Sequence, residues 1–410
     1  MQIKRSMIGI FLENLGNLCR KVFLLGILVI FIATFAPRSA MARSATLLSP
    51  ENLEINSKIP LQNLIQPRSI LGFLPNNSSG LPRGNAVTDG KAILRYSLPI
   101  DNRPIRELQG NLEDIANQIR AKRWKPIGQD INKAEKVLSD RTPEILAAIA
   151  EEKKTAAQEL ITEIQAGIIN LREAAEVKDS EQVWTQRNSI LGKVGLIEEM
   201  MVVGFPYQVP PEYSHLPQLK GRATIEFTTN KGKITMIADG YSAPVTAGNF
   251  VDLVQRGFYD GLEITSAEES FTVQAGDPPG EAAGFIDPQT KEYRSIPLEI
   301  LVAGDEAPTY GITLEDAGRY RDLPVLPFSS YGAVVMGHPE FDANGGSSQF
   351  FFFLFEPELT PAGRNLLDGR YAVFGYLVKG KEVLGSLRAG DTIESAQVVE
   401  GIENLLTPAT

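Results

Sequence analysis

The spacing of apolar residues changes at a proline-rich segment, and this change limits the possible folds more than any other feature. Before the segment, apolar residues recur at gaps of three and four, as on one face of an α-helix. After it, ATIEFTT at 223–229 and KITMIADG at 233–240 alternate apolar and polar residues, as half-buried strands do. The segment 205–220 holds four prolines and is predicted to be a semi-rigid linker. We therefore expect a helical domain followed by a β-domain. The predicted fold class is a multidomain α and β protein.

The helical part, residues 90–204, is predicted to contain one strand and a four-helix bundle. AILRYSLPI at 92–100 suits a single extended strand that ends at a proline, and pairing of this strand with the β-domain is an open alternative. Apolar stripes at 105–119 and 124–138 predict the first two helices. Short connections and one stripe per helix are typical of an antiparallel bundle.

The third and fourth helices are predicted from their first residues. Thr142 followed by Pro143 resembles a helix cap and a first-turn proline, so a helix of about 45 Å is expected from there to Leu171. Asp179, with Gln182 three residues later, is expected to cap the fourth helix. The mixed charges of EEKK at 151–154 indicate a solvated face rather than a binding site.

The N-terminal residues are predicted to direct export. In residues 1–42, basic residues precede the apolar run 22–36, and the small residues Ala40 and Ala42 follow at a cleavage-site pattern. We expect a signal peptide cleaved after Ala42, with an uncleaved anchor as the alternative. Residues 43–89 contain five prolines and NNSSG, which predicts a flexible proline-rich arm.

Composition excludes several classes of function. The net charge is −10, and because residues 1–42 carry five basic residues and one acidic residue, the rest of the chain carries −14. Such a chain disfavours nucleic acid as a partner, and no membrane insertion is expected after cleavage. The only cysteine, Cys19, lies in the signal peptide, so disulfides cannot stabilise the mature chain.

Four motifs of the β-domain stand in register with one known family. They are APVTAGNFVDLVQRGFYDG at 243–261, VQAGDP at 273–278, SSQFFFFL at 347–354 and LLDGRYAVFGYLVKG at 366–380. Residues 221–405 therefore resemble the cyclophilin-type peptidyl-prolyl cis-trans isomerases. The resemblance implies a closed cyclophilin-like β-barrel, proline-containing polypeptide segments as ligands, and no cofactor.

The order of the segments resembles that of the thylakoid-lumen cyclophilins, in which an export signal and a PsbQ-like helical bundle precede the cyclophilin domain. This second resemblance implies export to the thylakoid lumen or the periplasm. It also implies a foldase that assists photosystem II assembly and repair, with photosystem II subunits as partners.

The resemblance assigns the candidate site residue by residue. The catalytic position, normally an arginine, is occupied by Ser266. The positions implied for substrate binding are Phe271, Thr272, Gln274, Gly337, Gln349, Phe351, Leu366, Leu367 and Tyr371. Three of these depart from the family pattern: Thr272 replaces a methionine, Leu366 a tryptophan that contacts cyclosporin, and Tyr371 a histidine.

The chemistry explains why the missing arginine matters. Rotation about an X–Pro bond crosses a barrier of about 18 to 20 kcal/mol, and the resemblance implies that a donor at the prolyl nitrogen lowers it. Loss of one such donor typically costs about 10²- to 10³-fold in rate. Arg294, Arg364 and Arg370 are candidate substitutes. Two functions therefore remain open: a weak isomerase, and a non-catalytic module that holds proline-containing segments.

Other candidate sites are weaker. His215 and His338 are too far apart in the sequence to predict a metal site, and a structural or rim role is expected for His338. GGSSQ at 345–349 lacks the lysine of a phosphate-binding loop. The insertion between Gly280 and Gly332 is acidic and is predicted to be a solvated loop, with weak cation or partner binding as the alternative.

Overall fold

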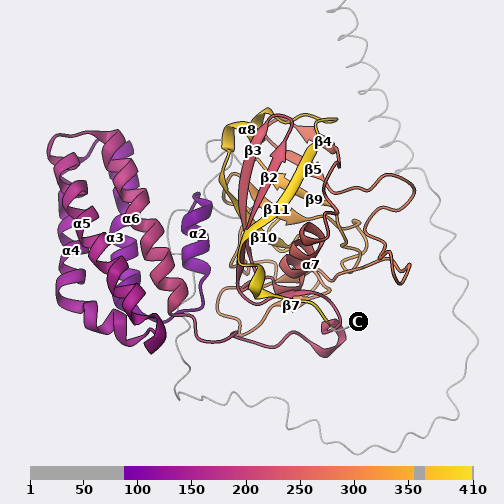
Figure 1. The fold of residues 1–410 in the computed structure, drawn as a ribbon, viewed down its shortest axis with the longest axis horizontal. Helices are drawn as coiled ribbons and strands as arrows, with labels where there is room; N and C mark the ends of the chain where they lie inside the picture. The colour runs from indigo at the N-terminus through magenta and orange to yellow at the C-terminus, as the bar shows by residue number, and fades with distance from the viewer. Residues whose placement is uncertain (1–86, 355–364, 409–410) are drawn as a thin grey trace, which may run out of the picture. The chain divides into compact units, whose positions relative to one another are not determined.

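The structure is a computed structural model that describes residues 87–354 and 365–408 (Figure 1). The predicted signal peptide, nearly all of the predicted arm, and Arg364 lie outside these residues. Within them, no helix is both long and apolar enough to cross a membrane.

Four amphipathic helices form the bundle, as predicted (Figure 1). They are α3 (Arg103–Arg120), α4 (Trp124–Ala147), α5 (Lys154–Glu176) and α6 (Ser180–Met200). Their apolar stripes meet in one buried cluster. The predicted cap of the fourth helix is confirmed, because the Asp179 side chain accepts hydrogen bonds from the backbone N–H groups of Glu181 and Gln182.

The predicted start of the third helix is wrong. α4 continues through Pro143 to Ala147, and α5 begins only after a short 3₁₀ turn, η2 (Glu151–Lys153). Instead of capping a new helix, the Thr142 hydroxyl donates to the Leu138 carbonyl at 2.6 Å. Pro143 has no N–H to donate to the Ser139 carbonyl, and the Thr142 hydroxyl bonds the carbonyl one residue earlier, so the helix continues with one ladder bond missing.

The predicted strand at 92–100 is also wrong. This segment forms the helix α2 (Gly90–Ser97), whose N-terminus is capped by the Asp89 carboxylate accepting from Lys91 N–H at 3.0 Å. Ile93 and Leu94 are buried in a cluster with Phe328 and Tyr376. The segment therefore contacts the β-domain through side chains, without strand pairing.

The β-domain is a closed antiparallel barrel, as predicted. Its strands are β2 (Arg222–Thr229), β3 (Gly232–Asp239), β4 (Ile264–Glu268), β5 (Thr272–Ala275), β8 (Ala333–Met336), β9 (Phe350–Phe353), β10 (Val373–Lys379) and β11 (Ile393–Glu400). They lie in the order β11-β2-β3-β10-β8-β9-β5-β4. The two outer strands meet at a bridge between Glu263 and Thr392, and Ile264 N–H donates to the Asp391 carbonyl at 2.7 Å.

Further elements complete the barrel (Figure 1). Helix α7 (Pro244–Gln255) is buried along most of its length and contributes to the barrel core. Helix α8 (Lys381–Ser386) follows β10. In the insertion, β6 (Glu299–Ile300) pairs with β7 (Thr309–Tyr310).

The segment predicted to be a linker contains regular structure at two places. Residues Pro211–Tyr213 form a 3₁₀ turn, η3. The last residues form β1 (Gln218–Leu219), which pairs with β12 (Leu405–Leu406) at the other end of the domain. The expectation that the whole segment lacks an element is therefore wrong.

Candidate functional site

One row of residues crosses four neighbouring strands of the barrel. Ser266 on β4 lies opposite Gln274 on β5. Gln274 in turn lies opposite Phe351 on β9, and Phe351 lies opposite Val335 on β8. Strand register therefore places the serine, the amide and the aromatic ring side by side, although they are far apart in the sequence.

Strand alternation turns this row away from the barrel core. Val273 and Ala275 on β5 are buried in the core, as are Phe350 and Phe352 on β9. The residues between them on each strand point to the opposite face, because side chains alternate along a strand. Phe351 accordingly lies outside the barrel core and is only half-buried.

An apolar slot surrounds the Phe351 ring. The Tyr371 ring lies 5.8 Å from it in an edge-to-face arrangement, and the Phe328 ring lies 6.5 Å away on a nearly parallel plane. Leu367, Tyr371 and Phe351 are partly buried and pack against the same buried cluster. Such an apolar surface with an aromatic wall suits contact with a small apolar group such as a proline ring.

His338 supports one wall of this slot. Its ring lies 4.7 Å from the Tyr371 ring. Its two ring nitrogens lie 2.8 Å and 2.9 Å from the carbonyl oxygens of Pro339 and Arg370. These contacts hold the histidine ring against Tyr371 and give it a structural role at the rim.

A chain of hydrogen bonds forms the polar part of the site. The Gln274 amide donates through Nε2 to Oε1 of Gln349 at 3.1 Å. The Gln349 amide donates through Nε2 to Oδ1 of Asp277 and to the Ala283 carbonyl, both at 3.0 Å. Gln349 is further held because its carbonyl accepts from Gly337 N–H at 2.8 Å.

The remaining predicted site residues lie at the edges. Phe271 is 47% exposed and packs edge-to-face on Phe353 at 5.9 Å, and Thr272 lies opposite Phe353 in the strand register. The Leu366 side chain is 90% exposed, so it adds little to the wall of the slot.

The candidate substitute arginines that the structure describes are engaged elsewhere. Arg294 donates to the Asp252 carboxylate at 2.6 Å, and its guanidinium lies 4.7 Å from the Phe285 ring. Arg370 donates to the Glu315 carboxylate at 2.5 Å. Each of these arginines already has a carboxylate partner.

Comparisons with known proteins agree with this geometry. Residues 89–202 match the family described as "Peptidyl-prolyl cis-trans isomerase CYP38-like, PsbQ-like domain", and residues 224–404 match "Cyclophilin type peptidyl-prolyl cis-trans isomerase/CLD". A putative thylakoid lumen peptidyl-prolyl cis-trans isomerase of Synechocystis is 57% identical over 326 residues, which cover 80% of this chain and 86% of that protein. The chain belongs to the cyclophilin family.

Two plant cyclophilins are also similar. The chloroplastic isomerase CYP38 of Arabidopsis thaliana is 46% identical over 345 residues, which cover 81% of this chain and 78% of that protein. The chloroplastic isomerase CYP37 of the same plant is 31% identical and covers 87% of this chain and 78% of its own length. Each of these matches covers more of this cyclophilin than either of its two domains alone, so the similarity extends over both domains.

The acidic insertion of this cyclophilin is internally paired. Arg319 donates to the carboxylates of Asp305 at 2.6 Å and Asp322 at 2.7 Å. Glu315 is the partner of Arg370, and Asp316 accepts from the Thr313 hydroxyl. Nowhere in residues 87–354 and 365–408 do three or more metal-ligating side chains gather in a way that could hold a metal ion.

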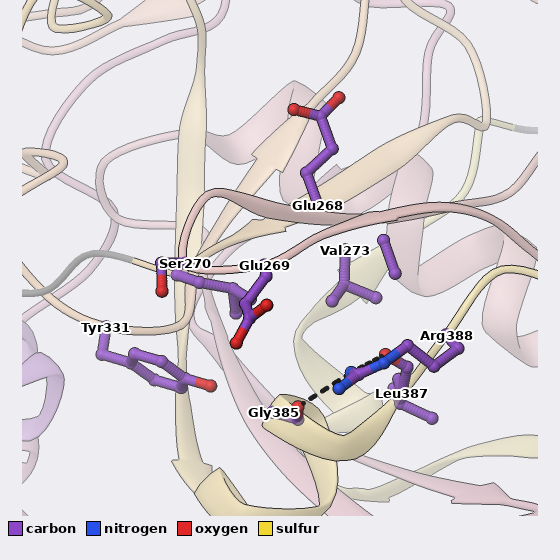
Figure 2. Close-up of a pocket in the computed structure, with 10 residues that line it drawn as sticks. Glu268, Glu269, Ser270, Val273, Tyr331, Gly385, Leu387 and Arg388 are labelled. Atoms are coloured by element: carbon purple, nitrogen blue, oxygen red, sulfur yellow. Dashed lines mark hydrogen bonds between the residues drawn. The ribbon is translucent and has the colours of Figure 1, made fainter. Parts of the chain in front are cut away.

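A cavity of about 200 Å³ is lined by Ala267 and Val273, the chain neighbours of Ser266 and Gln274, but by no residue of the row itself; Figure 2 shows its lining. It is also lined by the turn 268–270, by Tyr331 and Leu354, and by Gly385, Leu387 and Arg388 at the end of α8 and just after it. Val273, on the core side of β5, also lines it, whereas Gln274 points to the other face. This cavity is therefore distinct from the candidate slot around Phe351.

Asp277 is a member of the site that the sequence analysis did not single out, as are Phe328 and Val335. It stands in VQAGDP, three residues after Gln274, so the motif contained it. Its contact is with Gln349, which lies 72 residues away in the sequence. That contact depends on the tertiary register of β5 and β9, which local spacing does not report.

Proposed function

We propose that this cyclophilin binds proline-containing polypeptide segments in the slot of Phe351, Leu367 and Tyr371, and isomerises them slowly. Binding rests on burial of an apolar ring, for which the slot residues are present. Turnover rests on a donor at the prolyl nitrogen, and the row position that should supply it holds Ser266. This position in the register, directly opposite Gln274, is the observation that carries the proposal.

Serine is a poor substitute for arginine in this role. Its hydroxyl is uncharged and short, whereas a guanidinium carries a full charge on a long side chain. Arg294 and Arg370 each have a carboxylate partner, which further supports weak turnover. The same facts favour the second candidate, a non-catalytic chaperone that holds proline-containing segments during assembly.

For location and clients, we propose export to the thylakoid lumen and a role in photosystem II assembly or repair. The support is the printed description of the Synechocystis relative as a thylakoid lumen protein and the match of residues 89–202 to a PsbQ-like domain family. Proline-containing lumenal segments of photosystem II subunits should bind more tightly than the same segments with proline changed to alanine. Equal affinity for both would contradict this choice of client.

The function itself is tested by measuring binding and turnover of one X–Pro peptide on the same chain. The wild-type chain should bind the peptide, but its turnover should be about 10²- to 10³-fold below that of a cyclophilin with the arginine. Phe351→Ala should weaken binding, whereas Phe341→Ala, at a side chain that is 95% exposed, serves as the matched control. Turnover as fast as in an arginine-containing cyclophilin, or equal binding by both variants, would overturn the proposal.

A further inference from the structure

The hydrogen bonds around Gln349 fix the orientation of its amide. Both acceptors of its Nε2 group, the Asp277 carboxylate and the Ala283 carbonyl, lie at 3.0 Å and have no hydrogen to donate. A flipped amide would place Oε1 of Gln349 against two oxygens and would lose both bonds. Although amide orientation is usually assigned from the network, only one orientation satisfies these two acceptors.

The orientation of Gln349 in turn sets that of Gln274. With Nε2 of Gln349 turned to Asp277, its Oε1 faces Gln274 and can only accept a hydrogen bond. Gln274 meets this oxygen with its own Nε2 at 3.1 Å. The reverse orientation of Gln274 would bring two amide oxygens together. The acceptor at Asp277 therefore sets the orientation of the Gln349 amide, and the Gln349 amide sets that of Gln274.

This order decides which groups Gln274 offers to a ligand. One of its two amide hydrogens is used on Gln349, which leaves the second hydrogen and Oε1 for a bound peptide. Gln274 is half-buried and lies opposite both Ser266 and Phe351 in the strand register. Position 266 holds no cation that could donate to a ligand. The second N–H of the Gln274 amide is therefore the side-chain amide donor that this row places next to the slot.

We infer that Asp277 is a positioning residue for ligand binding, which acts through Gln349 to fix the amide of Gln274. This inference rests on the proposed function, because the ligand is the proline-containing segment. Asp277 does not touch the ligand in this arrangement. Together with the Ala283 carbonyl, it determines that the peptide meets a fixed donor and acceptor instead of an amide that turns between two orientations.

A double-mutant cycle tests the inference. Asp277→Ala and Gln274→Ala should each weaken binding of an X–Pro peptide by about 5- to 10-fold, the size of a lost hydrogen bond. Their combination should weaken it no more than the stronger single change, because Asp277 acts only through Gln274. Asp277→Asn keeps an acceptor oxygen and should bind within about 3-fold of the wild-type chain.

The side-chain amide signals of Gln274 and Gln349 in nitrogen-15 NMR spectra give a second readout. Asp277→Ala should shift both pairs of signals, whereas Asp277→Asn should leave them close to their wild-type positions. If Asp277→Ala does not fold, Gln349→Met breaks the same chain of bonds and should likewise shift the Gln274 signals and weaken binding.

The outcomes separate this inference from the proposed function. Additive losses of affinity, or Gln274 signals that do not move, would overturn the positioning role in a chain that still binds peptide. A wild-type chain that binds no X–Pro peptide would overturn the proposed function, and the inference with it. Non-additive losses together with rescue by Asp277→Asn support the positioning role.

Discussion

The fold of this cyclophilin does not depend on the side chain at position 266, whereas its proposed catalysis does. Ser266 pairs with Gln274 next to a register shift between Ile264 and Ser266, and this pairing between β4 and β5 needs only its backbone. The row formed by Ser266, Gln274, Phe351 and Val335 carries no charge. On the proposed function, the barrel and its apolar slot persist without the charged group that would act in the transition state.

The exposed Leu366 side chain leads to a prediction about cyclosporin. Since Leu366 is 90% exposed and lacks the indole donor of the tryptophan implied at this place, cyclosporin should bind weakly. Leu366→Trp should raise its affinity by about 10-fold or more, measured by calorimetry. Leu323→Trp, at another exposed leucine, is the control, and nanomolar binding by the wild-type chain would contradict the prediction.

Strand alternation allowed part of the site to be predicted from the sequence. It places Gln349 and Phe351 on one face and Phe350 and Phe352 on the other, and the burial of Phe350 and Phe352 in the core confirms this division. The contact of Asp277 with Gln349 could not be predicted in the same way. It joins two strands whose relative register is set by the whole barrel.

At the scale of elements, short segments were the hardest to predict. The segment that forms α2 has apolar residues in succession, a pattern that does not distinguish a short strand from a buried helix. The deciding signal was Asp89, whose carboxylate caps the helix. The Thr142–Pro143 pair misled the prediction of the third helix. A threonine followed by a proline is typical of a helix start, but here both residues lie within α4, where the Thr142 hydroxyl donates to the Leu138 carbonyl.

The long helices were predictable because their apolar stripes repeat over many turns, and their caps can be tested. Asp179→Ala should destabilise the bundle by about 1 kcal/mol, since two N–H groups at the start of α6 lose their acceptor. Asp179→Asn keeps an acceptor and should cost less. Chemical unfolding followed by circular dichroism measures both, and equal stability of Asp179→Ala and the wild-type chain would contradict the role of this cap.

At the scale of the whole molecule, each domain buries a carboxyl group that makes its stability depend on pH. Glu299 is fully buried and accepts from the N–H groups of Val245 and Thr246 at the start of α7, at 3.2 Å and 2.8 Å. Burial raises its pKa to about 7. In the bundle, burial likewise raises the pKa of Glu198 to about 7, although Arg106 lies beside it.

These pKa shifts predict that acidification from pH 8 to pH 5.5 stabilises the fold. Because the folded pKa lies above the unfolded value, the folded state binds more protons, and this stability is lost as pH rises through about 7. The gain should be about 2 kcal/mol for each group. Glu299→Gln should remove its share of the pH dependence, measured as unfolding free energy at both pH values. An unchanged pH dependence in this variant would contradict the prediction.

The most direct test of the missing donor is the isomerisation rate of Ser266→Arg, measured together with its affinity for the same X–Pro peptide. The rate constant kcat/KM should rise by about 10²- to 10³-fold, while Kd changes by less than about 3-fold, because the donor acts mainly in the transition state. Thr265→Arg adds the same charge to the neighbouring, exposed position on β4 and should leave the rate equal to that of Thr265→Val, which likewise lacks the hydroxyl that donates to the Gln274 carbonyl at 3.2 Å. A wild-type chain that is already fast, or a Ser266→Arg variant no faster than Thr265→Arg, would contradict the proposal that Ser266 limits catalysis.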